Sequence, residues 1–196
     1  MFQDFKEISL CESGGEIMEK WKIESDFIHN NLRCIAVMQK MGHRCGYVGL
    51  LNYHPSYGKD YSDECLSYSD IVDKPIGKRG IIPVICMTVK EGLISPDVYF
   101  DVHGGVTFAG GGNGSMYPIQ SDLWWFGFDC AHCDDGRDLE TAYKYNLMDE
   151  ITYKKLKSID SMFPLDYECR SKEYVENECK SLAEQLALIS AMNRTE

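Results

Sequence analysis

The fold is indicated first by an apolar run near the start of the chain, Leu32-Arg33-Cys34-Ile35-Ala36-Val37-Met38. A short run of apolar and β-branched residues is typical of a buried strand. Residues 40–44 include Gly42 and predict a turn. A second apolar run follows this turn, Cys45-Gly46-Tyr47-Val48-Gly49-Leu50-Leu51. We therefore expect a β-hairpin over residues 32–51.

Further strands are expected downstream of this hairpin. Residues 97–103 alternate in character, which predicts a strand that Gly104-Gly105 interrupts and that resumes over residues 106–109. Residues 123–130 form a third β-prone segment. The apolar stretch 81–89 predicts one more strand, which Pro83 would bend or place at an edge. This succession predicts an antiparallel sheet.

The C-terminal third has helical character. Charged residues interleave with apolar ones over residues 138–161, which predicts one or two short helices. A longer helix is expected after Ser171, a favourable N-cap residue that Glu173 and Glu176 follow in the first turn. Apolar residues then recur at steps of three and four, and this stripe should pack on the sheet. It consists of Val175, Cys179, Leu182, Leu186 and Ile189.

These elements predict the fold class. We expect an α+β protein in which an antiparallel sheet packs against C-terminal helices. Residues 1–196 are expected to form a single domain, with a helical part at 138–196. Residues 68–90 have the composition of an insertion or connection, and periodicity does not predict the structure of residues 1–27.

Composition narrows the partners that we expect. The chain has 31 acidic and 20 basic residues and a formal net charge of −11. This charge repels phosphate and argues against a nucleic-acid reader or a protein that binds anionic membranes. Nine scattered cysteines and the lack of a signal-peptide pattern predict reduced thiols in the cytoplasm. The longest apolar stretch, residues 81–89, is far shorter than the roughly 20 residues of a membrane span.

Polar side chains interrupt the most apolar segments, and this pattern predicts a polar pocket because an unpaired buried polar group costs free energy. Asp101 and His103 share a strand face by their spacing, so the carboxylate could orient the imidazole. Residues 52–61 predict an ordered loop whose aromatic side chains fold over the sheet. The expected ligand-binding residues are Arg44, Tyr47, His54, Tyr57, Asp101, His103, Thr107, Trp125, Asp129 and His132.

Some of the same residues could instead have a purely structural role. Arg44 could contact an anionic ligand, although a structural ion pair with Asp101 or Asp129 is slightly favoured. Side chains alternate between the two faces of a strand, so every second residue of 124–128 is expected in the core. Trp125 and Asp129 are expected on the opposite face, with the pocket.

Two kinds of chemistry remain open for this pocket. A zinc site could combine the Cys130-Ala131-His132-Cys133 segment with His103, His43, Cys45 or His54. Alternatively, Cys45 or Cys130 could act as a thiolate nucleophile, with His103 or His132 as the base. Neither arrangement has a complete motif, so we expect no metal and no cofactor, and we assign no catalytic residue.

Three segments, together with the intervening residues 52–58, carry a resemblance to known sequences. These segments are residues 45–49, residues 102–108 and residues 124–132. With them, the chain resembles a group of uncharacterised proteins associated with phage and prophage genomes, over roughly residues 28–136 and the final helix. The resemblance implies a viral context. It implies no activity, fold or catalytic role.

Two functions follow as expectations. The first is a phage-type accessory protein that binds and blocks a host factor or a signalling molecule, for which an acidic surface is suited to basic partners. The second is a small hydrolase or metal-dependent enzyme that acts on a nucleotide-like substrate in a pocket of His, Asp and Cys residues. In the first case the partner is a host protein or a small-molecule ligand, and the protein lies in the host cytoplasm.

Overall fold

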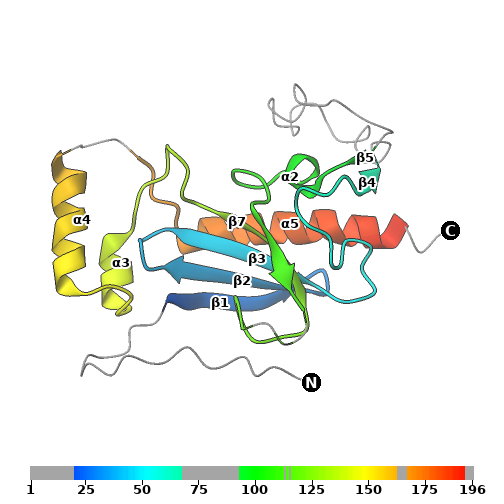
Figure 1. Ribbon diagram of the computed structural model, residues 1–196, viewed down its shortest axis with the longest axis horizontal. Coiled ribbons are helices and arrows are strands. Elements are labelled where there is room, and N and C mark those ends of the chain that lie inside the picture. The colour runs from blue at the N-terminus through cyan, green and yellow to red at the C-terminus, as the bar shows by residue number, and fades with distance from the viewer. Residues whose placement is uncertain (1–19, 68–92, 113, 115, 163–166, 193–196) are drawn as a thin grey trace, which may run out of the picture.

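The computed structural model describes residues 20–67, 93–112, 114, 116–162 and 167–192 (Figure 1). Five antiparallel strands form the main sheet, in the order β1-β2-β3-β7-β6. They are β1 (Trp21–His29), β2 (Leu32–Gln39), β3 (Arg44–Leu50), β7 (Trp124–Asp129) and β6 (Phe108–Gly111). A separate pair joins β4 (Leu66–Ser67) to β5 (Leu93–Ile94). The helices are α2 (Pro96–Tyr99), α3 (Leu139–Lys144), α4 (Glu150–Met162) and α5 (Lys172–Met192). The α+β class predicted from the sequence is confirmed.

The predicted hairpin is the centre of the sheet. Strands β2 and β3 pair from Arg33 opposite Gly49 to Met38 opposite Arg44. The turn between them needs a glycine, because Gly42 has a φ of +85°. A side chain there would also crowd the backbone of Asp138, which lies 3.1 Å from the position of a Cβ atom. The hairpin turn is thereby held against the start of α3.

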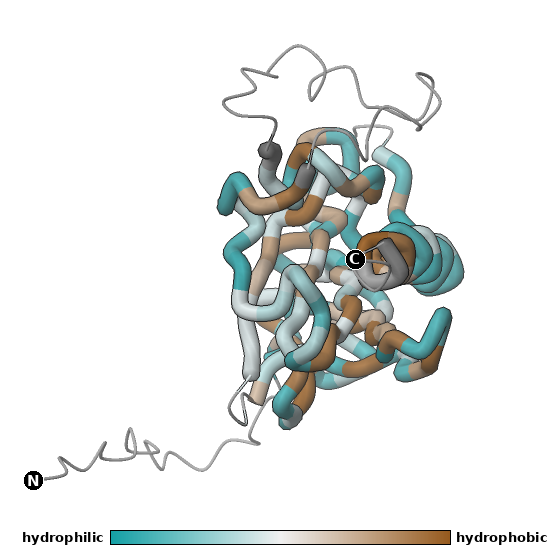
Figure 2. The backbone as a smooth tube through the Cα atoms, turned by 90° about the vertical axis from the view of Figure 1, so that its right-hand side faces the viewer, coloured by the Kyte–Doolittle hydropathy of each residue, from teal (hydrophilic) through white to brown (hydrophobic). Residues whose placement is uncertain are grey.

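Helix α5 covers one face of the sheet, as predicted. The hydroxyl of Ser171 accepts a hydrogen bond from the Tyr174 backbone N–H at 3.1 Å and caps the helix. All five stripe residues are buried against β2 and β3. Figure 2 shows α5 end-on, with its hydrophobic residues toward the sheet. Burying each large apolar side chain stabilises the fold by roughly 1.5–3 kcal/mol.

Helix α5 approaches the sheet closely at Gly46. A Cβ atom at Gly46 would lie 2.6 Å from the sulfur of Cys179 and 2.4 Å from the ring of Phe128. These distances are below van der Waals contact, so the absence of a side chain at Gly46 is what allows the helix and the sheet to meet here.

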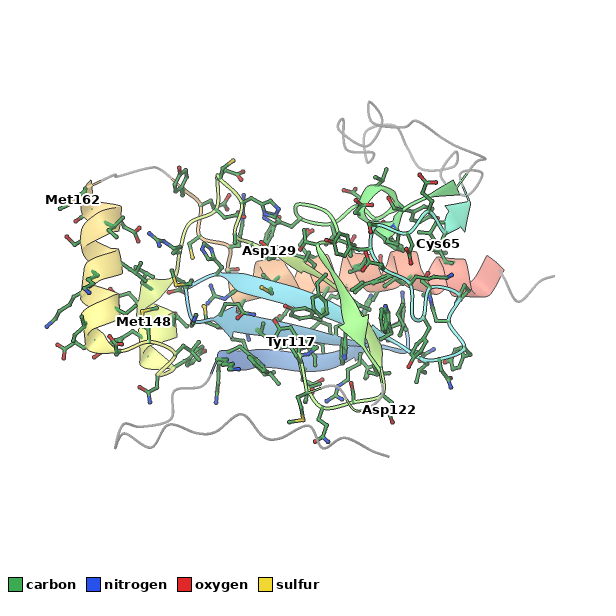
Figure 3. All side chains as sticks on the ribbon, viewed as in Figure 1. Cys65, Tyr117, Asp122, Asp129, Met148 and Met162 are labelled. Carbon is green, nitrogen blue, oxygen red and sulfur yellow. The ribbon has the colours of Figure 1, made fainter. Side chains whose placement is uncertain are left out.

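The opposite face of the sheet carries a second core. The buried residues of this core are Ile35, Val37, Cys45, Tyr47 and Trp125. Tyr117 packs against it (Figure 3). The hydroxyl group of Tyr117 forms a short hydrogen bond with that of Tyr47. Phe126 and Phe128 point instead into the core beneath α5. The alternation predicted along this strand is therefore confirmed, with Trp125 on the face away from α5.

Of the one or two short helices predicted over residues 138–161, two are present, α3 and α4. Asp138 caps α3, because its carboxylate accepts a hydrogen bond from the Thr141 backbone N–H at 3.0 Å. Leu139 and Ala142 of α3 pack with Met38 in a third cluster of buried residues. Tyr143 and Tyr153 stack between the two helices, with ring centroids 4.6 Å apart.

The strand predicted over residues 97–103 is wrong. Residues 96–99 form the single-turn helix α2, since Pro96 at the first helical position has a backbone suited to a helix start. The chain then bends, and strand structure resumes at Phe108–Gly111 instead of over 106–109. Asp101 and His103 consequently do not share a strand face.

Other sequence predictions lie partly beyond the described chain. The strand predicted over residues 81–89 and the insertion predicted over 68–90 lie entirely outside the described residues. Of the N-terminal part, for which no structure was predicted, residues 21–29 form β1. Within the described residues, no helix combines the length and the apolar character that crossing a membrane requires.

His54 joins the loop after β3 to α5. Its Nδ1 atom accepts a hydrogen bond from the Ser56 backbone N–H at 3.1 Å, and its Nε2–H donates to the carbonyl of Leu186 at 3.0 Å. The ring can satisfy both partners only when it is neutral. Burial of the ring lowers the pKa of His54 from its usual 6.5.

We expect this histidine to make folding stability depend on pH. Above pH 6.5 the ring is neutral in both states, whereas below it the unfolded chain binds a proton that the folded chain excludes. The free energy of unfolding should therefore fall as the pH drops from 6.5, by up to about 1.4 kcal/mol per pH unit. Urea unfolding between pH 5 and 7 should show a shallower slope for His54→Asn than for the unmodified protein. The control His29→Asn, at a less buried histidine, should retain the steep slope. Equal slopes for His54→Asn and the unmodified protein would contradict this role.

Candidate functional site

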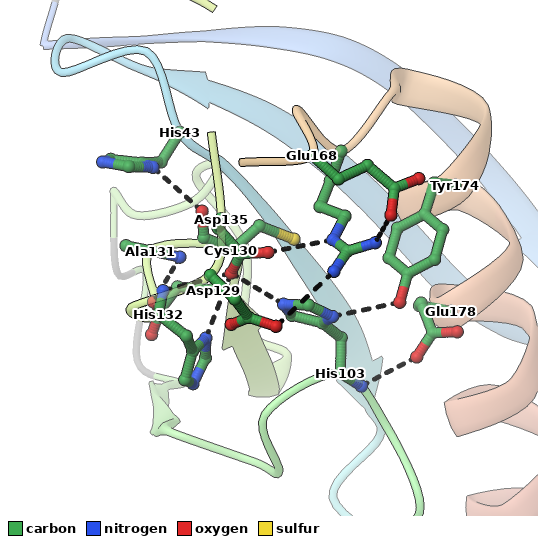
Figure 4. Close-up of polar contacts among 12 residues, drawn as sticks. His43, His103, Asp129, Cys130, Ala131, His132, Asp135, Glu168, Tyr174 and Glu178 are labelled. Carbon is green, nitrogen blue, oxygen red and sulfur yellow. Dashed lines mark hydrogen bonds and ion pairs between the residues drawn. The ribbon is translucent and has the colours of Figure 1, made fainter. Parts of the chain in front are cut away.

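The candidate site is centred on Asp135, whose side chain is fully buried. Its Oδ2 atom accepts hydrogen bonds from His103 Nε2 at 2.9 Å and from the His132 backbone N–H at 3.1 Å. Its Oδ1 atom accepts a third hydrogen bond from Arg170 Nε at 2.9 Å. A buried carboxylate thus joins three separate parts of the chain (Figure 4).

Local structure fixes where each of these residues lies. His132 and Asp135 belong to the turn after β7, which the Asp135 backbone N–H closes by donating to the His132 carbonyl at 3.1 Å. His103 lies in the loop after α2, where its backbone N–H donates to Glu178 Oε2 of α5 at 2.7 Å. Arg170 immediately precedes α5. The start of α5 therefore holds both loops.

The two histidine rings converge on the same carboxylate oxygen. His132 Nδ1 lies 3.4 Å from Asp135 Oδ2, is buried, and has no hydrogen-bond partner. The two ring centroids are 5.3 Å apart and the rings are nearly perpendicular. His103, His132 and Asp135 each offer one ligand atom, and these three atoms lie within 4.8 Å of one another. Two imidazoles and one carboxylate at this spacing are a ligand set for a divalent metal ion.

A glycine makes room for this arrangement. A Cβ atom at Gly104 would lie 2.1 Å from the Nε2 and Cε1 atoms of the His132 ring. Gly104 also has a φ of +66°, a conformation that side chains disfavour. The Gly104-Gly105 pair, predicted to interrupt a strand, is instead the bend that brings His103 beside His132.

A second layer of polar contacts orients the donors. His103 Nδ1 lies 3.0 Å from the Tyr174 hydroxyl oxygen. The guanidinium of Arg170 lies over the ring of Tyr174, with 5.2 Å between its central carbon and the ring centroid. Histidines that bind metals commonly have such a partner on the second ring nitrogen.

Asp135 is ionised at neutral pH. Burial alone would raise the pKa of its carboxyl group, but hydrogen bonds from His103, Arg170 and the His132 backbone lower the pKa to about 2. The site therefore provides an anionic oxygen between two imidazoles.

The structure brings together some of the predicted site residues. His103 and His132 are both in the cluster. Beside the cluster, the Thr107 hydroxyl donates a hydrogen bond to Asp129 Oδ2 at 2.8 Å. Asp129 Oδ1 accepts a second hydrogen bond, from the Ala131 backbone N–H in the same turn. These four residues surround the turn after β7.

The other predicted site residues lie elsewhere. Tyr47 and Trp125 belong to the core opposite α5. His54 contacts the carbonyl of Leu186, and Tyr57 packs against Trp124. The aromatic loop 52–61 therefore lies against the C-terminal part of α5 and the start of β7. The carboxylate that holds His103 is Asp135, not the expected Asp101.

Arg44 forms a structural ion pair, but its partners differ from those expected. Its guanidinium donates to Glu24 at 2.7 Å and to Asp138 at 2.9 Å, and also to the carbonyl of Arg170 at 2.9 Å. Glu24 is the extra residue of a β-bulge between Ile23 and Ser25, which no sequence pattern indicated. Through its hydrogen bond to the Arg170 carbonyl, Arg44 holds the backbone of a residue whose side chain contacts Asp135.

Sequence reasoning missed Asp135, Arg170 and Tyr174. A signal existed for Asp135, because it follows His132 by three residues, a spacing that allows both side chains of one turn to face the same point. Arg170 and Tyr174 lie more than 30 residues further along the chain, and only the docking of α5 brings them to the site.

The thiol chemistry considered for this region is disfavoured. Burial raises the pKa of Cys45 to about 11 and raises that of Cys130 further. Both thiols are therefore protonated at neutral pH, which makes them poor nucleophiles.

Comparisons of the chain with models of protein families, with curated proteins and with solved structures find no match. The resemblance to phage proteins therefore stays a prediction.

We expect Arg44→Gln to destabilise the protein by about 3–5 kcal/mol, because it leaves the buried Glu24 carboxylate without its partner. Arg33→Gln on the neighbouring strand is the matched control. It breaks a partly exposed pair with Asp26 and should cost less than about 1 kcal/mol. Urea unfolding measures both changes, and equal costs for the two variants would contradict a structural role for Arg44.

Proposed function

We propose that the protein is a metal-dependent hydrolase whose divalent metal ion is bound by His103, His132 and Asp135. The observation that carries this proposal is the convergence of three donor atoms on one point, including a buried His132 Nδ1 that has no hydrogen-bond partner. The proposal departs from the sequence-based expectation of no metal, because Asp135 and its position were not foreseen.

The distances suit a zinc-type ion. Two ligand atoms at tetrahedral positions around zinc are about 3.3 Å apart. Asp135 Oδ2 lies 2.9 Å from His103 Nε2 and 3.4 Å from His132 Nδ1. Three protein ligands also leave a fourth position for water or substrate, as in catalytic zinc sites. The side chain of His132 is 34% exposed, so solvent can reach the site.

The Tyr174 hydroxyl suits His103 with and without a metal ion. Without metal, His103 Nε2–H donates to Asp135, and Nδ1 accepts a hydrogen bond from the Tyr174 hydroxyl. With metal on Nε2, the proton lies on Nδ1 and the Tyr174 oxygen accepts it. A hydroxyl group can do either, so the same heavy-atom arrangement serves both tautomers. Tyr174 is therefore a positioning residue.

The chemistry follows from such a centre. Held by His103, His132 and Asp135, a zinc ion would lower the pKa of a water ligand to about 7 and would polarise a substrate carbonyl group. In the hydrolysis that we propose, the water oxygen bonds to the electrophilic carbon and the bond to the leaving group breaks. One proton of the water goes to the leaving group. Asp135 and His103 contribute by holding the ligand geometry.

Zinc titration by calorimetry tests the site. We expect the unmodified protein, first treated with a chelator, to bind one zinc ion, and His132→Ala and Asp135→Asn to lose this binding. Tyr174→Phe should weaken binding by about 10- to 100-fold, because His103 loses its orienting partner. Hydrolysis of a chromogenic ester by the zinc-loaded protein should decrease in the same order.

Matched controls separate binding from folding. His29→Ala removes a half-buried histidine that is paired with Glu184 far from the site, and should leave zinc binding unchanged. Tyr143→Phe, on α3, is the control for Tyr174→Phe. If His132→Ala retains zinc affinity while its thermal unfolding is unchanged, the metal site is refuted.

A second candidate function rests on the acidic surface. The chain has a net charge of −11, and beside the site Asp134 and Glu168 are exposed by 73% and 75% of their side chains. We propose that such a surface suits a phage-type accessory protein that binds and blocks a basic host factor. In this function, the cluster of His103, His132 and Asp135 only holds the loops against the start of α5 and takes part in no reaction.

Salt dependence tests the second candidate. A pull-down with host lysate should recover a stoichiometric basic partner, and binding should weaken strongly between 50 and 300 mM salt because exposed charges are screened. Asp134→Lys and Glu168→Lys should weaken it too, whereas His132→Ala should not. Recovery of no partner at low salt would rule this function out.

A further inference from the structure

We infer that the substrate of the proposed hydrolase is neutral or cationic at its reacting end, and is not a phosphate or a carboxylate. The inference rests on the proposed function and extends it to the class of substrate. It departs from the nucleotide-like substrate that was expected from the sequence.

Arg170, the cationic side chain of the site, is paired with three carboxylates of the protein. Arg170 Nε donates to Asp135 at 2.9 Å, and its Nη1 donates to Glu168 Oε2 at 2.5 Å. Its Nη2 lies 3.9 Å from a carboxylate oxygen of Asp134. A guanidinium that recognises a phosphate or carboxylate presents a pair of N–H groups to it. Two N–H groups of Arg170 therefore donate to carboxylates of the protein, and a third carboxylate lies within ion-pair distance, so an anionic substrate would have to compete with these partners.

The other arginines near this turn are engaged as well. Arg137, two residues after Asp135, forms an ion pair with Asp160 of α4. Arg44 is buried between Glu24 and Asp138. Neither guanidinium is therefore available to offset the charge of an anionic substrate.

Carboxylates also outnumber cationic side chains around the cluster of His103, His132 and Asp135. Asp134 and Glu168 are exposed beside Arg170, and Glu178 contacts the backbone of His103. Asp129 lies in the turn that holds His132. These four carboxylates and Asp135 outnumber the charge of Arg170, while Arg44 and Arg137 are each paired with carboxylates of their own. Partly exposed charges act over several ångströms, so an approaching anion is repelled.

Cobalt provides a probe that needs no known substrate. The visible absorption of the cobalt-loaded protein reports ligands that enter the fourth position, and inorganic phosphate and imidazole represent an anion and a neutral donor. We expect imidazole to bind the unmodified protein more tightly than phosphate does. In the double variant Asp134→Asn/Glu168→Gln, phosphate should bind about three- to tenfold more tightly, with imidazole affinity unchanged.

A second double variant is the control. Asp149→Asn/Glu150→Gln removes the same charge at the start of α4, and it should leave phosphate affinity as in the unmodified protein. If phosphate binds the unmodified protein more tightly than imidazole, or if Asp134→Asn/Glu168→Gln leaves it unchanged, the inference is overturned while the metal site stands. If the protein takes up no cobalt, the proposed function fails and the inference fails with it.

Discussion

The close packing of α5 on the central hairpin is the contact on which the rest of the structure depends. Gly46 removes the side chain that would separate the two layers, so that the sulfur of Cys179 lies directly over the strand. The stripe from Val175 to Ile189 then buries its apolar surface along β2 and β3. This packing fixes the position of the first turn of the helix, and the polar site is built on that turn.

The candidate site depends on this packing, because residues at the start of α5 orient its side chains. Asp135 lies on a turn after β7 and His103 on a loop after α2, and neither element is regular enough to orient a side chain by itself. The start of α5 supplies Arg170 and Tyr174, which hold the carboxylate and the imidazole from the helix side. A buried anion is tolerated here because three N–H groups, from His103, the His132 backbone and Arg170, donate to it.

Much of the fold could be predicted from the sequence because its signals are local. The hairpin at residues 32–51 and the helix after Ser171 each follow from periodicity and a turn or cap residue. The site was harder, because His103 and His132 stand out as polar residues in apolar segments whereas their shared partner depends on tertiary structure. The strand predicted over 97–103 failed because Pro96 favoured a helical turn over the alternation of the residues after it. Pairings such as that of Arg44 with Glu24 depend on a bulge that leaves no trace in the sequence.

The hydroxyl group of Tyr174 has a consequence for how the protein could acquire a metal ion. Because it can donate to one tautomer of His103 and accept from the other, loading requires a proton to move between two ring nitrogens and no rearrangement of the backbone. The cost of reorganisation is therefore small, and the layers of the fold are already assembled by apolar packing. This contrasts with small zinc domains, whose chains fold only as the ion binds. A protein of this design would exchange its ion with the surroundings while remaining folded.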